Sequence, residues 1–295
     1  MLKHCLVAAA ALLVIALGSG GRAEAGQPIW FYRAQSPAHH VTYFYPSFHL
    51  RDDRVPRPPE TVLDSRTQLV LEADIAEARA HPELLTPYIL NPTPLDLAAY
   101  FTPAEIAGIR ARAACNGVAP LVEKLRLSFI SVFVALPCPK PNAGTYEELM
   151  EAAAKQRGLK VAALESAEEQ LAALASLPDR LAIEGIKEYS VHPERAEQLI
   201  ERMITLYNAG KYEALYQLAM ENGPKNAADN KLFLDKIVIE RNRLMVKRMA
   251  GMLEEGNALI VIGALHFPGK DGIVDLLTRQ GFTVTPVDAS AGKLP

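Results

Sequence analysis

Residues 258–266 read ALIVIGALH, and this stretch decides how the rest of the chain can fold. The apolar run is typical of a buried strand, and Gly263 then turns the chain so that His266 follows its end. Such a ring lies at the carboxyl end of a strand, the edge of an open α/β sheet where ligands and catalytic groups collect. Residues 41–49, VTYFYPSFH, follow the same order and end in His49. We therefore expect His49 and His266 to meet in space, although more than 200 residues separate them.

The N-terminus has the pattern of a signal peptide. Residues 5–17 are an unbroken apolar run, residues 18–21 interrupt it, and residues 23–25, AEA, fit the small-x-small cleavage rule. The run is too short to span a bilayer comfortably. We expect residues 1–25 to be removed, a mature chain that begins at Gly26, and export to the periplasm or beyond. An N-terminal anchor that is retained is the alternative.

Charge and cysteine content narrow the class of protein. Removal of residues 1–25 takes away two basic side chains and one acidic one, so the net charge moves from -3 to -4. This mild acidity argues against a nucleic-acid partner, which needs a clustered basic face. No second long apolar run follows, so we expect no stable membrane insertion of the mature chain. The two remaining cysteines, Cys115 and Cys138, are expected to form a disulfide in an oxidising compartment.

Residues 26–295 read as one α/β domain. Strand–helix–strand alternation at both ends predicts a central, mostly parallel sheet with right-handed crossovers and a large helical insertion between its N- and C-terminal units. The helical stretches are expected over residues 76–157, from residue 166 to residue 253, and near residues 271–280. The strands are expected at residues 29–34, 40–48, 68–72, 159–164, 258–263 and 282–287.

Four polar residues fall at predicted strand ends: His49, Glu72, Glu165 and His266. Two imidazoles and one or two carboxylates suffice to bind a divalent transition metal. Asp74 follows two residues after Glu72, so its side chain points the same way. A histidine after a strand can also be a cap or a core residue, and Glu165 can instead stabilise the dipole of the helix that follows it.

An arginine interrupts the apolar stripe of the helix around residues 230–254. At about 100° per residue, Arg241 lies in the middle of a face formed by residues such as Leu234, Val238 and Met245. An unpaired buried charge is costly, so Arg241 is expected to meet a carboxylate, most simply Glu72 or Glu165, or an anionic ligand. The alternative is that its stem packs while its head reaches water. Asn242 is next in sequence and could donate a hydrogen bond nearby.

Taken in order, these motifs resemble the TraB/GumN/PrgY family, which is related to the Tiki proteins. The resemblance covers essentially all of the mature chain. The motifs that carry it are LEAD at residues 71–74, ALES at 163–166, ERN at 240–242 and GALHFPG at 263–269. One departure stands out: the first motif reads PSFH at residues 46–49, with Pro46 where the family has glycine. Proline fixes φ and removes an amide donor, so a glycine turn cannot be copied there.

The resemblance implies a metal-dependent, peptidase-like hydrolase, and with the expected export the protein would act on a peptide or a small molecule outside the cytoplasm. His49, Glu72 and His266 would bind a divalent metal ion (Mn, Co or Zn) with one position open for water. Glu165 or Asp74 would act as the base. Arg241, with Asn242 beside it, would stabilise an oxyanion. Pro46 favours the alternative, a non-catalytic periplasmic binding protein for a peptide, a pheromone or a haem-like ligand.

Export generates the first testable prediction. Protein recovered from the periplasm should have the mass of residues 26–295 and contain no free thiol, because Cys115 and Cys138 are paired. Closing a loop of this size adds about 3 kcal/mol to the free energy of unfolding. Intact-mass analysis with alkylation under denaturing, non-reducing conditions checks both points, and two alkylated cysteines would contradict the second.

Overall fold

The run ALIVIG forms strand β5 (Ala258–Gly263) near the centre of a six-stranded sheet, and all six of its residues are buried. The structure, a computed structural model, describes residues 28–49, 52, 54–138 and 145–294. The predicted signal peptide and Gly26 lie outside these residues. The other strands are β1 (Trp30–Gln35), β2 (Val41–Ser47), β3 (Gln68–Asp74), β4 (Lys160–Ser166) and β6 (Thr283–Asp288). Every predicted strand lies within two residues of these bounds.

The sheet has the order β4-β3-β5-β2-β1-β6. Strands β4, β3, β5 and β2 pair in parallel, while β1 is antiparallel to both β2 and β6. A short turn suffices between β1 and β2, whereas the parallel pairs need long crossovers, which the helices provide. The expected α/β class with a mostly parallel sheet is thereby confirmed. The strand–helix–strand unit at the C-terminal end also implies that β5 and β6 pair with each other. This detail is wrong, because the two strands run in the same direction but are separated by β2 and β1.

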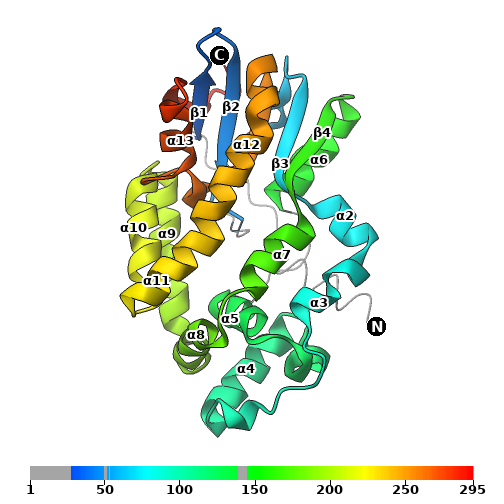
Figure 1. Ribbon diagram of the computed structural model, residues 1–295, viewed down its shortest axis with the longest axis vertical. Helices are drawn as coiled ribbons and strands as arrows, with labels where there is room; N and C mark the ends of the chain where they lie inside the picture. The colour runs from blue at the N-terminus through cyan, green and yellow to red at the C-terminus, as the bar shows by residue number, and fades with distance from the viewer. Residues whose placement is uncertain (1–27, 50–51, 53, 139–144, 295) are drawn as a thin grey trace.

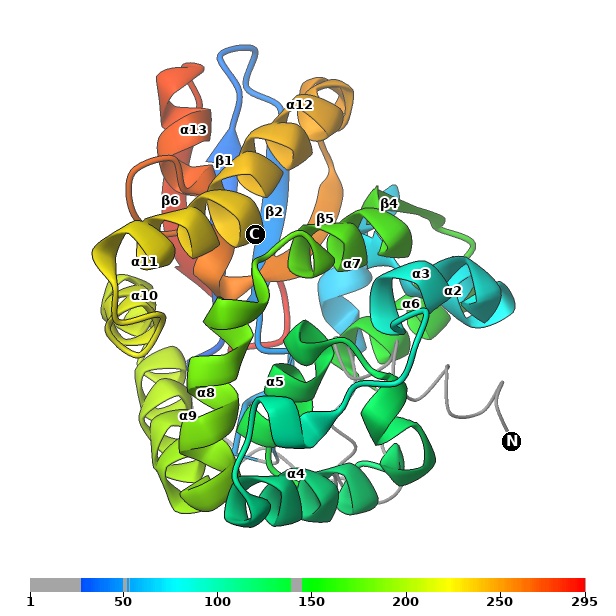
Figure 2. The same ribbon diagram turned by 60° about the horizontal axis from the view of Figure 1, so that its bottom comes forward.

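Helices cover both faces of the sheet (Figures 1 and 2). On one face, Leu71 and Val261 belong to a core with Met150 of α6 (Tyr146–Gln156). On the other face, Val70 and Ile260 share a core with α12 (Glu240–Glu255) and α13 (Ile273–Arg279). Successive side chains of a strand point to opposite faces, so strands buried on both sides are apolar throughout. This explains the unbroken runs in the sequence.

The remaining helices lie beyond the carboxyl edge of the sheet (Figure 2). These helices are α2 (Ile75–Ala80), α3 (Thr86–Ile89), α4 (Pro103–Cys115), α5 (Leu127–Ala135), α7 (Ala167–Ala175), α8 (Asp179–Val191), α9 (Pro193–Asn208), α10 (Tyr212–Glu221) and α11 (Ala227–Leu234). Most of those before α9 share one core, and α9 and α10 contribute to another. Two of these helices begin with complete capping boxes, Thr102 with Glu105 and Ser166 with Glu169.

The block over residues 76–157 is less regular than predicted. Leu90 and Leu125 form an isolated antiparallel bridge, and short 3-10 turns replace α-helix over Leu97–Ala99 and Ala119–Lys124. The residue before a proline avoids the α region, and the sequence NPTP over residues 91–94 therefore ends α3.

The predicted disulfide is present. Cys115 at the end of α4 is bonded to Cys138, 23 residues further along the chain. The bond ties α4 to the segment that follows α5. No helix in the described ranges combines the length and apolar character that a membrane crossing needs.

Candidate functional site

The predicted site residues meet at the carboxyl ends of the four parallel strands. Glu72 lies in β3, Glu165 lies in β4, His49 follows β2, and His266 closes the 3-10 turn η6 (Ala264–His266) after β5. His49 Nε2 is 3.3 Å from Glu72 Oε2, and His266 Nε2 is 3.7 Å from Glu72 Oε1. The two histidines therefore face one carboxylate, as their placement after neighbouring strands predicts.

Glu72 is the centre of this arrangement and is buried. Its Oε1 accepts hydrogen bonds from Arg241 Nη2 at 2.6 Å and from Gln170 Nε2 at 2.9 Å. Its Oε2 accepts one from the amide of Gly263 at 2.7 Å and lies beside His49. Burial by itself raises the pKa of Glu72, but the surrounding charges, Arg241 and His49 among them, hold it well below its usual range. Glu72 is thus a carboxylate at neutral pH.

Arg241 joins the two carboxylates. Its Nη2 donates to Glu72 Oε1 and to Glu165 Oε2, both at 2.6 Å, and its Nε lies 3.0 Å from Glu165 Oε2. The sequence predicted a partnership with Glu72 or Glu165, and the structure has both. Burial raises the pKa of Glu165 above its usual range, although Arg241 acts in the opposite direction. We refer to Glu72, Glu165, Arg241, His49 and His266 together as the strand-end cluster.

A π-helical turn, η5 (Asp235–Ile239), precedes Arg241. At the end of the turn the Glu240 amide donates to the carbonyl of Asp235, five residues back. Arg241 Nη1 donates to the carbonyl of Ile237 at 3.0 Å and lies 3.4 Å from His266 Nε2. One-turn π segments inside α-helices are frequent at functional sites. Here the turn orients the helix so that Arg241 faces the carboxyl edge of the sheet.

Asn242 fixes the orientation of His266. The side-chain amide of Asn242 donates to the carbonyls of His266 and Asp271, so its Oδ1 is left to accept from His266 Nδ1 at 2.6 Å. The assigned tautomer of His266 therefore carries hydrogen on Nδ1 and presents the Nε2 lone pair to the cluster. Burial lowers the pKa of His266 to about 3, which keeps the ring neutral. Asn242 is a positioning residue, since it holds His266 from behind.

His49 lies between two carboxylates. Its Nδ1 is 3.0 Å from Glu147 Oε1, and its Nε2 faces Glu72. Burial lowers the pKa of His49, but the charges of Glu72 and Glu147 outweigh this and raise it to about 10. The sequence analysis missed Glu147, which lies in the first turn of α6, and Gln170 on α7. The capping pattern at Thr145 and Glu148 marks the start of α6, but no pattern places α6 beside His49.

Two other charged residues near these strands, Asp74 and Arg248, lie outside the strand-end cluster. Asp74 is the N-cap of α2, where its Oδ1 accepts from the Glu77 amide at 2.8 Å. Arg248, near the apolar stripe of α12, pairs with Glu169 and donates to the Leu164 carbonyl. Both side chains therefore have local structural partners.

The donor set suits a divalent metal ion in its chemistry. Each imidazole is held through Nδ1 by an acceptor, Glu147 for His49 and Asn242 for His266, as metal-binding histidines usually are. A Cβ at Gly263 would lie 2.5 Å from His49 Nε2 and 3.2 Å from Glu72 Oε2, so glycine leaves this position clear. Among the described residues, however, no group of three or more His, Cys, Asp or Glu side chains is arranged to hold a metal ion. Protein donors, Arg241 among them, take the oxygens of Glu72.

Comparison with known protein families gives a match that includes every residue of the strand-end cluster. The sequence model described as the TraB/PrgY/gumN family matches residues 30–286, which include His49 and His266. No curated protein and no solved structure gives a match.

The paired carboxylates generate a prediction about stability. Arg241→Met should lower the free energy of unfolding by about 3–5 kcal/mol, because Glu72 and Glu165 lose the cation that they share inside the protein. Denaturant unfolding followed by circular dichroism measures this difference. Adding Glu165→Gln to Arg241→Met should recover part of the loss, since one buried charge is then removed.

The matched control is Arg248→Met on the same helix. Arg248 pairs with the exposed Glu169, and surface ion pairs contribute about 0–1 kcal/mol. Equal losses for Arg241→Met and Arg248→Met would contradict the special place of Arg241.

Proposed function

Because the chain belongs to the TraB/PrgY/gumN family, we propose that it is an exported, metal-dependent hydrolase that cleaves a carbonyl bond in a peptide or small-molecule substrate. One observation carries the proposal. Two imidazoles that are each oriented through Nδ1 present Nε2 to one buried carboxylate, and a guanidinium joins that carboxylate to a second one.

The cluster supplies the groups that acyl-bond hydrolysis needs. A base must take a proton from the attacking water, and a positive charge must stabilise the oxyanion that forms. Glu165 is the base in this proposal, because burial makes its carboxylate a better proton acceptor than an exposed one. Arg241 Nη1 is the oxyanion donor. Its 3.4 Å approach to His266 Nε2 is the longest of its polar contacts, so a substrate oxygen can replace that contact.

Metal binding in this proposal falls to His49, Glu72 and His266, and His49 must release a proton to bind, because its pKa of about 10 keeps the ring protonated without a metal. A divalent ion such as Mn, Co or Zn, when bound, polarises a carbonyl group and makes a water molecule more acidic. The charge balance of the site suits a cation, because the carboxylates of Glu72, Glu147 and Glu165 outnumber the basic groups that contact them, Arg241 and His49. Asn242 and Glu147 orient the two imidazoles.

A binding protein without turnover is the second candidate, for a peptide, a pheromone or a haem-like ligand. The oxygens of Glu72 already accept from protein donors, which favours a static cluster. Pro46 weighs less than the sequence suggested. It lies in β2, its carbonyl accepts from Tyr207 Oη at 2.6 Å, and His49 still reaches Glu72.

Turnover separates the two candidates. Mature protein stripped with a chelator and reloaded with Mn²⁺, Co²⁺ or Zn²⁺ should cleave casein or a fluorogenic peptide library with at least one of these ions. Glu72→Gln and His266→Ala should each reduce the rate by roughly 10²–10⁴-fold, because each removes a group of the reaction centre. His81→Ala is the control, since His81 is exposed and pairs with Glu83 rather than with a residue of the cluster. Peptide binding without cleavage under all three metals would favour the binding protein.

Orientation of His49 by Glu147 can be tested separately from activity. Glu147→Gln should weaken binding of Zn²⁺ or Mn²⁺ by about 10–100-fold, the usual effect of losing a carboxylate behind a metal-binding histidine. Titration calorimetry measures the affinity. Glu151→Gln, one turn further along α6, removes a carboxylate that pairs with Lys155 and should leave metal affinity unchanged. Equal affinities for Glu147→Gln and the parent protein would remove Glu147 from the site.

A further inference from the structure

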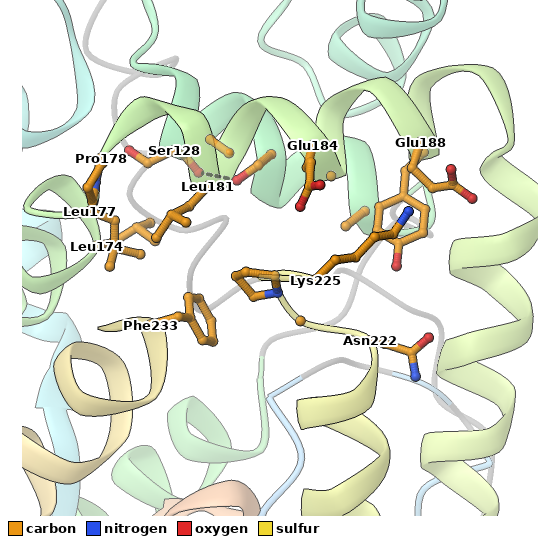
Figure 3. A pocket seen from close by; sticks show the side chains of 17 residues that line it. Ser128, Leu174, Leu177, Pro178, Leu181, Glu184, Glu188, Asn222, Lys225 and Phe233 are labelled. Carbon is orange, nitrogen blue, oxygen red and sulfur yellow. Dashed lines mark hydrogen bonds between the residues drawn. The ribbon is translucent and has the colours of Figure 1, made fainter. Parts of the chain in front are cut away.

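The helical core contains a cavity of about 290 Å³ that the reaction chemistry does not use. Its walls come from α5, α7, α8, α11 and the α10–α11 connection (Figure 3). Small-molecule sites begin near this size and are mostly apolar, with a few polar groups that fix orientation.

The two ends of the cavity differ in character. At one end lie Leu174, Leu177 and Phe233, with no charged side chain among the labelled residues (Figure 3). At the other end lie Glu188 and Lys225, and Glu188 pairs with Arg195 outside the cavity wall. An occupant therefore needs an apolar group for the first end and can keep polar atoms at the second.

The apolar end is the one closer to the strand-end cluster. Leu174 follows Gln170, which contacts Glu72, by one turn of α7, about 6 Å along the helix axis. Phe233 precedes Arg241 by eight residues, about 12 Å along the helix. Helix α7 packs against η5, so both paths lead to the same region. An extended peptide advances about 3.3 Å per residue, which places the cavity roughly two to four residues from the cluster.

One wall of the cavity contains a glycine, Gly185, in place of a residue with a side chain. It lies in the interior of α8, where glycine weakens a helix. A Cβ built on Gly185 meets no heavy atom within 4 Å, so open space borders the backbone there. The absence of a side chain at this position enlarges the cavity.

We propose that this cavity is a substrate subsite that binds an apolar side chain of a peptide, two to four residues from the bond that is cleaved. The inference rests on the proposed function for its place in the reaction and extends it to substrate selection. The apolar end takes the side chain, and the peptide backbone runs toward Glu72 and Arg241.

The test measures binding rather than cleavage, so it does not depend on turnover. The probes are N-acetyl-pentaalanine amide and its five variants with one phenylalanine each, titrated against the full mature protein by calorimetry or by amide shifts of α8. At least one phenylalanine peptide should bind about tenfold or more tightly than pentaalanine, as burial of an aromatic side chain predicts. Gly185→Leu should abolish that preference, because the leucine fills the cavity.

The matched control is Gly251→Leu, at an exposed position of α12 where a Cβ also meets no heavy atom within 4 Å. It should keep the preference. Phe233→Ala provides a second variant, which should reduce the preference by removing an apolar wall. Equal binding of all six peptides by the parent protein, no measurable binding, or a preference that survives both Gly185→Leu and Phe233→Ala would overturn the inference. A preference for one phenylalanine peptide, together with no cleavage of casein or the peptide library under all three metals, would keep the cavity as a peptide-binding site and refute the hydrolase.

Discussion

The fold is organised around the burial of one ionised carboxylate. A charge removed from water is tolerated only when donors and opposite charges surround it, and Glu72 has only 4% of its surface exposed. The groups around it come from β5, α7, α12 and from His49, which follows β2. These elements span most of the described chain, so the contacts of Glu72 depend on correct docking of the N- and C-terminal units on one sheet. The cluster is therefore the place where the two ends of the sequence depend on each other.

Much of this arrangement could be read from the sequence. The run ALIVIG and the run VTYFYPS at residues 41–47 each predict a strand. Parallel strands bring their carboxyl ends to one edge of the sheet. The meeting of His49 with His266 follows from that rule alone. Arg241 on an apolar stripe required a buried anion, and the two carboxylates at strand ends were the available partners.

Other parts could not be read from the sequence, for physical reasons. Glu147 and Gln170 lie on helices whose starts are marked by capping boxes, but the sequence does not say which strand end each helix packs beside. The pairing of β6 with β1 depends on the order of the strands in the sheet, and the spacing of apolar residues along a strand does not indicate that order. The role of Asn242 depends on two backbone carbonyls that are brought close only by the loop after η6.

The π turn η5 has a consequence for the long helix that contains it. One extra residue in a helix shifts everything beyond it by about 100° around the axis. The turn therefore changes which side chains of α12 face the same direction as those of α11. Phe233 of α11 can line the cavity while Arg241 of α12 faces the carboxyl edge of the sheet. Deletion of a single residue within Asp235–Ile239 would restore a continuous α-helical register. The other residues of α11 and α12 would stay the same. The two helices could then no longer face the cavity and the sheet at the same time, so either Phe233 would leave the cavity wall or the Arg241 guanidinium would turn away from the cluster.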